Sequence, residues 1–160
     1  MQKPKRTFRT TNGTQAGIET IETGMRFLTA CYVWLRPEPS GAEVTVGRGG
    51  HTPALILRRG GEVERVQPPG PLVGIYSDAA FGDMDLRLAA GDALVLYSDG
   101  ITEARGPDGS LYGPERLVDA LATGPRDTAE QIAESVARSV GAFEPIPSDD
   151  VALLVLRLAA

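Results

Sequence analysis

The sequence predicts an α+β fold in which helices cover stacked β-sheets. Short apolar runs separated by Gly, Pro and Ser turns predict a series of strands across residues 26–98. Two segments with helical periodicity follow, and one more apolar run occupies residues 151–158. The length of 160 residues suits a single domain with a core of its own.

The first predicted strand, RFLTACYVWL at 26–35, is apolar on both faces, so we expect both faces to be buried. Its Cys31 is the only cysteine, which excludes an internal disulfide and a multi-cysteine zinc site, and we interpret it as a core thiol. Turns then separate EVTVGRG, ALILR and EVERV, which together predict a β-meander. MDLRLA and ALVLYS, divided by a turn at 90–92, complete the predicted strands.

Two helices are predicted next. The first begins at Pro114, a favourable first helical position. Its inner face carries Leu117, Val118 and Leu121. The second begins at Thr128, with Gln131 in a capping-box arrangement. Its apolar stripe consists of Ala129, Ile132, Ala133, Val136, Ala137 and Val140. The last strand, VALLVLRL, is apolar on both faces like the first.

Charge and hydropathy exclude several partners. The formal net charge is −5, and four of the 16 basic residues lie within residues 1–9. The remainder carries 12 basic and 21 acidic residues, which repels nucleic acid and anionic lipid. No run approaches a membrane span, and the N-terminus lacks the apolar segment of a signal peptide. We therefore expect a cytoplasmic protein that binds neither nucleic acid nor membrane, with residues 1–24 as an N-terminal tail.

The run LVLYSDGITEA at 94–104 ends a predicted strand on a carboxylate. An Asp-Gly pair after alternating apolar residues is a signal for a tight hairpin turn, although the residues that follow show no strand alternation. The alternative is a buried strand that delivers Asp99 to its mouth, where Gly100 allows a close backbone approach. A carboxylate in that position favours a bound cation.

A second acidic feature is PSDDVALLVL, in which Asp149 and Asp150 directly precede the last strand. These carboxylates converge with Asp99 if the two strands are antiparallel neighbours. Such an oxygen-rich site without sulfur suits Mg²⁺ or Mn²⁺ better than zinc or copper. The alternative interpretation is that Ser148 and Asp149 only end a loop.

The ordered series RFLTACYVWL, GRGGHTPALIL, PLVG, LAAGDALVLYSDGITEA and SDDVALLVLR resembles the metal-dependent protein phosphatase (PPM) family, in its bacterial SpoIIE-like branch. The resemblance runs from about residue 25 to residue 158 and covers the C-terminal portion of the family domain, so we assign residues 25–160 to it. It implies a β-sandwich flanked by helices in αββα layers. It also implies hydrolysis of phosphoserine or phosphothreonine in a protein.

The resemblance assigns roles residue by residue. Asp99 matches the motif aspartate that binds a metal, and Asp149 matches the second ligand from this half of the domain. Gly100 and Asp150 would support these ligands, and the cofactor would be Mn²⁺ or Mg²⁺, with two ions in the complete family site and one or none where the bridging ligand is missing. His51 in GGHTPA falls on a family segment and would contact substrate, although a lone histidine in a glycine-rich turn is more often structural.

The sequence departs from the family pattern before Phe27, where the motifs that supply a bridging aspartate are missing. A catalytically incomplete domain that binds a regulatory partner is therefore the alternative function. By analogy the partner is a phosphorylated anti-anti-sigma-type protein. Strand edges left uncovered by the missing part favour a homodimer, or assembly with a separate N-terminal fragment.

Other enzyme classes have less support. A Ser-His-Asp hydrolase using His51 lacks a G-x-S-x-G elbow. Phosphate-loop chemistry is disfavoured because VGRGGH lacks the lysine of a Walker loop and the spacing of G-x-G-x-x-G.

Overall fold

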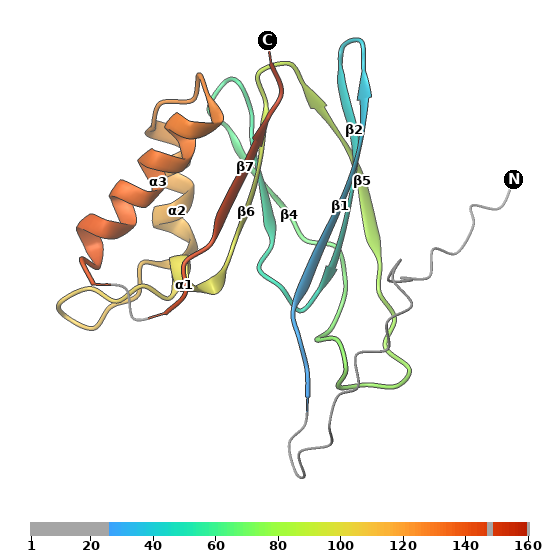
Figure 1. Ribbon diagram of the computed structural model, residues 1–160, viewed down its shortest axis with the longest axis horizontal. Coiled ribbons are helices and arrows are strands. Elements are labelled where there is room, and N and C mark those ends of the chain that lie inside the picture. The colour runs from blue at the N-terminus through green and yellow to red at the C-terminus, as the bar shows by residue number, and fades with distance from the viewer. Residues whose placement is uncertain (1–25, 147–148, 160) are drawn as a thin grey trace, which may run out of the picture.

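A computed structural model describes residues 26–146 and 149–159 (Figure 1). The strands are β1 (Ala30–Glu38), β2 (Gly41–Gly49), β3 (Ala54–Leu57), β4 (Val63–Val66), β5 (Asp83–Ala89), β6 (Ala93–Tyr97) and β7 (Leu153–Arg157). The helices are α1 (Asp99–Thr102), α2 (Gly113–Thr123) and α3 (Ala129–Phe143), all between β6 and β7. The expectations for residues 1–24 and the interpretation of Ser148 fall outside the described residues.

The strands form two antiparallel sheets that pack face to face. One has the order β1-β2-β5 and the other the order β4-β3-β6-β7. Side chains from their facing surfaces form one core cluster, which contains Val44, Val46, Ile56, Val66, Leu88 and Leu94. This arrangement confirms the predicted β-sandwich.

Helices α2 and α3 lie against the outer face of the four-stranded sheet (Figure 1). A second core cluster joins them to that sheet and includes Leu55, Val95, Leu117, Leu121, Ile132 and Val136. Within the described residues, no helix covers the outer face of the β1-β2-β5 sheet, so one helical layer of the αββα arrangement is present. None of the described helices is long and apolar enough to cross a membrane.

Helix α3 begins as the sequence predicts. The Thr128 hydroxyl accepts a hydrogen bond from Gln131 N at 3.1 Å, and the Gln131 side chain accepts one from Asp127 N at 3.2 Å. Ile132, Val136 and Val140 are buried, which confirms the centre of the predicted stripe. Ala137, at the edge of the stripe, is exposed.

The predicted meander is wrong, because the chain changes sheets three times. It leaves β2 in one sheet and enters β3 in the other through a turn in which Gly50 has a φ of 64°. It returns to the first sheet between β4 and β5, and it crosses once more between β5 and β6, which belong to different sheets although a tight turn joins them. Sequence turns of this kind show where a strand ends but not which sheet receives the next strand.

The crossing between β5 and β6 is fixed by Asp92, whose side chain is only 5% exposed. Its carboxylate accepts hydrogen bonds from Arg58 Nη1 at 2.8 Å, Arg59 N at 2.9 Å and Ala89 N at 3.0 Å. Burial alone raises the pKa of this carboxyl group, but these donors outweigh it and hold the pKa below its usual value. The two sheets are thereby tied together at this end.

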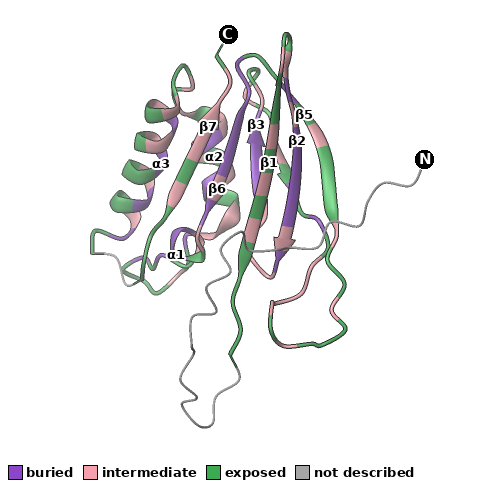
Figure 2. Cartoon of the chain, turned by 45° about the vertical axis from the view of Figure 1, so that its right-hand side comes forward, coloured by how far each residue is buried: buried purple, intermediate pink, exposed green. Residues whose placement is uncertain are grey.

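The first and last strands are less buried than their patterns predict (Figure 2). Tyr32 and Trp34 on the outer face of β1 remain 40% and 36% exposed, and Leu154 of β7 is 56% exposed. Both strands are edge strands, so each lacks a neighbour on one side among the described residues. Cys31 packs against the sandwich core and is half-buried, and this burial raises the pKa of its thiol.

Candidate functional site

The predicted site residues lie where β6 ends and β7 begins. These strands are antiparallel neighbours, with Tyr97 paired to Leu153, so the residues after β6 and before β7 share one end of the sheet. Asp99 is the first residue of the short helix α1, which confirms a strand that delivers Asp99 to its mouth rather than a hairpin. The condition for bringing the two acidic segments to one end of the sheet, that β6 and β7 are antiparallel neighbours, is therefore met.

Ser98 joins the two segments directly. Its backbone N–H donates to Ala152 O at 3.0 Å. Its hydroxyl donates to Asp150 O at 3.1 Å and accepts from Ala152 N at 2.9 Å. These three hydrogen bonds extend the pairing of β6 and β7 past the ends of both strands and fix the residues before β7 against the turn that carries Asp99.

Gly100 is required by the same close approach. It is buried, and a Cβ atom at this position would lie 2.4 Å from the carbonyl oxygen of Asp150. No side chain fits in that space unless the backbone moves. The predicted role of Gly100, to allow a close backbone approach, matches this geometry.

The two candidate carboxylates are exposed at this end of the sheet. Asp99 Oδ1 accepts from Gly100 N at 3.1 Å, and Asp149 Oδ1 accepts from Asp150 N at 2.7 Å. In each case, a hydrogen bond from the backbone N–H of the next residue to one carboxylate oxygen fixes the orientation of the side chain. The second oxygen of each takes part in neither bond.

The oxygen atoms at this end of the sheet are of the type that binds a hard divalent cation, but the described residues provide too few of them to complete a coordination shell. Carboxylate and carbonyl oxygens are the ligands that Mg²⁺ and Mn²⁺ prefer. Within residues 26–146 and 149–159, however, no three His, Cys, Asp or Glu side chains gather closely enough to hold a metal ion. The described residues thus provide part of a coordination shell at most.

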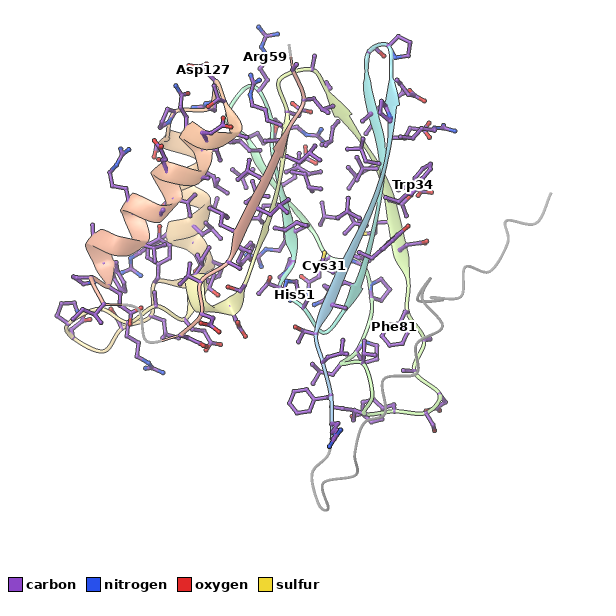
Figure 3. The ribbon with its side chains drawn as sticks, in the orientation of Figure 1. Cys31, Trp34, His51, Arg59, Phe81 and Asp127 are labelled. Carbon is purple, nitrogen blue, oxygen red and sulfur yellow. The ribbon has the colours of Figure 1, made fainter. Side chains whose placement is uncertain are left out.

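His51 belongs to a loop that is attached to the same end of β6 (Figure 3). The Thr52 hydroxyl donates to the carbonyl oxygen of Tyr97, directly before the Ser98 turn. His51 Nδ1 lies 3.1 Å from the Thr29 hydroxyl, and Arg48 Nη1 donates to His51 O at 2.8 Å. The loop is thereby attached to the end of β6 that leads to Asp99, and one ring nitrogen of His51 already has a hydrogen-bonding partner.

Sequence reasoning missed the residues that position this site. Ser98 and Thr52 stand beside the predicted residues Asp99 and His51, and each hydroxyl bonds to backbone on another strand or loop. In the sequence, the one feature that could have indicated their positioning role is that each is a small hydroxyl residue next to a candidate site residue. The partners of each hydroxyl depend on strand pairing, which the sequence does not specify.

Comparison with known proteins gives one family. The family model for Stage II sporulation protein E (SpoIIE) matches residues 5–159. The phosphoserine phosphatase RsbU of Bacillus subtilis is 27% identical over 117 residues, which cover 72% of this chain and 35% of RsbU. Stage II sporulation protein E of the same organism is 31% identical over 114 residues, which cover 68% of this chain and 13% of that protein.

A solved structure has a similar fold. The phosphatase domain of SpoIIE from Bacillus subtilis, presoaked with Mn, superposes with a TM-score of 0.61 at 21% identity. The match covers 81% of this chain and 57% of that domain. The chain therefore spans a minor part of the curated relatives and little more than half of the solved domain.

Proposed function

The chain belongs to the SpoIIE family, in the SpoIIE-like branch of the metal-dependent protein phosphatases, and from this we propose that it is the C-terminal portion of an active phosphatase domain. The proposed reaction is hydrolysis of phosphoserine or phosphothreonine in a regulatory protein, in the cytoplasm. The name of the related RsbU, a phosphoserine phosphatase, supports this reaction class. The proposed substrate is a phosphorylated protein of the anti-anti-sigma type.

The observation that supports the proposal is that Asp99 and Asp149 lie at the same end of the antiparallel pair β6 and β7. Ser98 and Gly100 bring their backbones together, as the assignment of both residues to one site requires. We propose that both carboxylates bind Mn²⁺ or Mg²⁺, with Asp150 and Gly100 as support. Bound divalent ions supply charge neutralisation for a phosphoryl group and a water of lowered pKa.

The chain's own residues then have defined tasks. The backbone N–H of Gly100 and that of Asp150 orient the two carboxylates. His51 is proposed to contact substrate through Nε2, because Nδ1 faces the Thr29 hydroxyl. Replacement of His51 by alanine tests this contact and is expected to raise KM for a phosphorylated protein.

The decisive experiment is a Mn²⁺ titration of the 160-residue chain by calorimetry, with hydrolysis of p-nitrophenyl phosphate followed on the same sample. Asp99→Asn and Asp149→Asn are each expected to weaken Mn²⁺ binding without unfolding the chain. Asp119→Asn, which neutralises an exposed carboxylate on α2, is the matched control. Unchanged Mn²⁺ binding in both site variants would contradict the metal assignment.

A second candidate function is a catalytically incomplete domain that binds a regulatory partner. The absence of three clustered metal-ligating side chains among the described residues favours it. In this case the calorimetric titration gives weak or no Mn²⁺ binding and no turnover. Binding of a phosphoprotein would then persist in Asp99→Asn.

We also propose that two copies associate through β7. Among the described residues, one edge of β7 pairs with no other strand, and its backbone groups are available to a strand of a second copy. Leu154 pairs with Leu96, a residue packed on the sandwich core, yet Leu154 is 56% exposed at this edge. Sedimentation velocity is expected to detect a dimer that Leu154→Lys dissociates, whereas a monomeric wild-type chain would contradict this proposal.

A further inference from the structure

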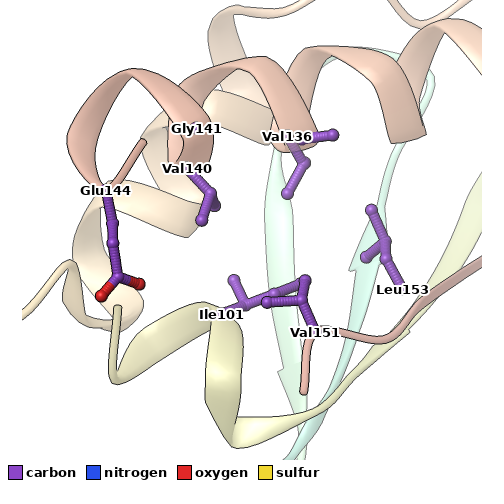
Figure 4. A pocket seen from close by; sticks show the side chains of 8 residues that line it. Ile101, Val136, Val140, Gly141, Glu144, Val151 and Leu153 are labelled. Carbon is purple, nitrogen blue, oxygen red and sulfur yellow. The ribbon is translucent and has the colours of Figure 1, made fainter. Parts of the chain in front are cut away.

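Beside the candidate carboxylates, an apolar hollow of about 140 Å³ lies between the end of α3 and the segment that leads into β7 (Figure 4). Its lining consists of Ile101, Val136, Ala137, Val140, Gly141, Glu144, Val151 and Leu153. A cavity of about 150 Å³ accepts a group the size of benzene, so this hollow has room for one apolar side chain.

Glu144 is the one charged residue in this lining. The residue is only 9% exposed, and its side chain makes no hydrogen bond or ion pair with any described residue. Figure 4 shows its carboxylate at one end of the row of apolar side chains, with Leu153 at the other end. Among the described residues, no side-chain oxygen is both fully buried and without a hydrogen-bonding partner, so the Glu144 carboxylate keeps contact with solvent at this end of the hollow and is available to a cation.

The position of Glu144 on its helix also favours a cation. It is the C-terminal cap of the 15-residue helix α3, where the helix dipole places partial negative charge. The last turn of α3 contains no basic residue. A cation at this point would therefore interact favourably with the carboxylate and with the carbonyl groups at the helix end.

Two residues of the lining follow the candidate carboxylates closely in the chain. Ile101 follows Asp99 by two residues, and Val151 follows Asp149 by two. A protein segment that presents a phosphorylated residue to these carboxylates therefore passes close to the hollow. Val151, at the entrance, is 46% exposed and offers apolar surface to such a segment.

We propose that this hollow is a docking site for a partner protein segment that carries an apolar side chain and a neighbouring arginine or lysine. The apolar side chain enters between Val140, Val151 and Leu153, and the cationic group pairs with Glu144. The identification of the partner as a phosphoprotein rests on the proposed function. The docking site itself depends only on the geometry of the hollow and the charge of Glu144.

The test is binding of fluorescein-labelled, unphosphorylated peptides in EDTA, measured by anisotropy. The peptides contain one leucine and one arginine, separated by Gly/Ser spacers of varied length, and the control peptides carry citrulline in place of arginine. At least one leucine-arginine peptide is expected to bind. Glu144→Gln is expected to lower the affinity for this peptide about tenfold, which corresponds to about 1.4 kcal/mol of binding free energy. Glu134→Gln, the same charge change on an exposed part of α3, is the matched control.

A second variant blocks the apolar part of the site. Gly141 lines the hollow and a Cβ there meets no atom within 4 Å, so the side chain of Gly141→Leu occupies space in the hollow and is expected to abolish binding. Absence of binding by every peptide overturns the proposal, as does equal binding by Glu144→Gln and Glu134→Gln. Because the assay needs neither metal nor turnover, a failure of the phosphatase proposal with retained peptide binding leaves this inference standing.

Discussion

Replacing Ser98 by alanine tests whether one hydroxyl group holds the two acidic segments together. In the folded chain this hydroxyl donates to Asp150 O at 3.1 Å and accepts from Ala152 N at 2.9 Å. The variant keeps the backbone hydrogen bond from Ser98 N to Ala152 O and removes neither candidate ligand. A loss of stability or of metal affinity therefore reports on the two side-chain bonds.

The expected magnitude follows from the burial of the site. An intramolecular hydrogen bond contributes about 0.5–1.5 kcal/mol, and water replaces part of that contribution at a half-buried position. Ser98 is half-buried, so each bond is assigned the lower part of this range. We expect Ser98→Ala to lower the free energy of unfolding by about 1–2 kcal/mol. Urea denaturation followed by circular dichroism measures this difference.

The control is Ser110→Ala, which removes a hydroxyl that donates to Asp108 at 2.7 Å in an exposed loop. We expect it to change the free energy of unfolding by less than about 0.5 kcal/mol. Calorimetry with Mn²⁺ is expected to give weaker binding for Ser98→Ala than for Ser110→Ala. If the two variants are equally stable and bind Mn²⁺ equally, Ser98 does not hold the acidic segments together and the reasoning is refuted.

Three further predictions concern stability. Asp92→Asn is expected to lower the free energy of unfolding by about 2–3 kcal/mol at neutral pH, because charge-assisted hydrogen bonds are lost. Since the folded-state pKa of Asp92 is lowered, its contribution is complete above the unfolded pKa of about 3.9 and is lost as the pH falls through the folded pKa. Urea midpoints measured from neutral to acidic pH should therefore converge for wild type and variant, and a constant difference would contradict this. Gly100→Ala is expected to destabilise the chain by about 1–3 kcal/mol, because its Cβ would lie 2.4 Å from Asp150 O, and an unchanged thermal midpoint would contradict the observed close approach. Gly141→Ala is expected to stabilise α3 by about 0.5–1 kcal/mol, because the Cβ meets open space, and a lowered thermal midpoint would count against that.

Much of the fold was predictable because local patterns determine the elements. The capping arrangement of Thr128 and Gln131 predicted the start of α3, where the Thr128 hydroxyl accepts from Gln131 N as expected, while the Gln131 side chain accepts from Asp127 N rather than from Thr128 N. The acidic residues at the ends of two apolar runs predicted that Asp99 and Asp149 share one end of a sheet. That prediction needed only antiparallel pairing of β6 and β7, which is present.

The remainder depends on long-range pairing, which local patterns do not specify. Gly50 and Asp92 read as ordinary turn residues, yet each marks a change of sheet. Glu144 reads as a solvated glutamate after a helix, and its burial follows only from how α1, α3 and the segment before β7 pack. The partners of the Ser98 hydroxyl likewise lie 52 and 54 positions away in the chain.

Residues 149–154 combine three proposed roles in one segment, and this has a thermodynamic consequence. Asp149 is a candidate metal ligand, Val151 forms a wall of the docking hollow, and Leu154 lies on the free edge of β7. A ligand that orders this segment reduces the cost of ordering it for a second ligand, so metal and peptide should bind cooperatively. Because such coupling is reciprocal, Mn²⁺ is expected to raise peptide affinity by the same factor by which peptide raises Mn²⁺ affinity. Calorimetric titration of each ligand with and without the other measures both factors. Independent binding would mean that the segment is already ordered in the free chain.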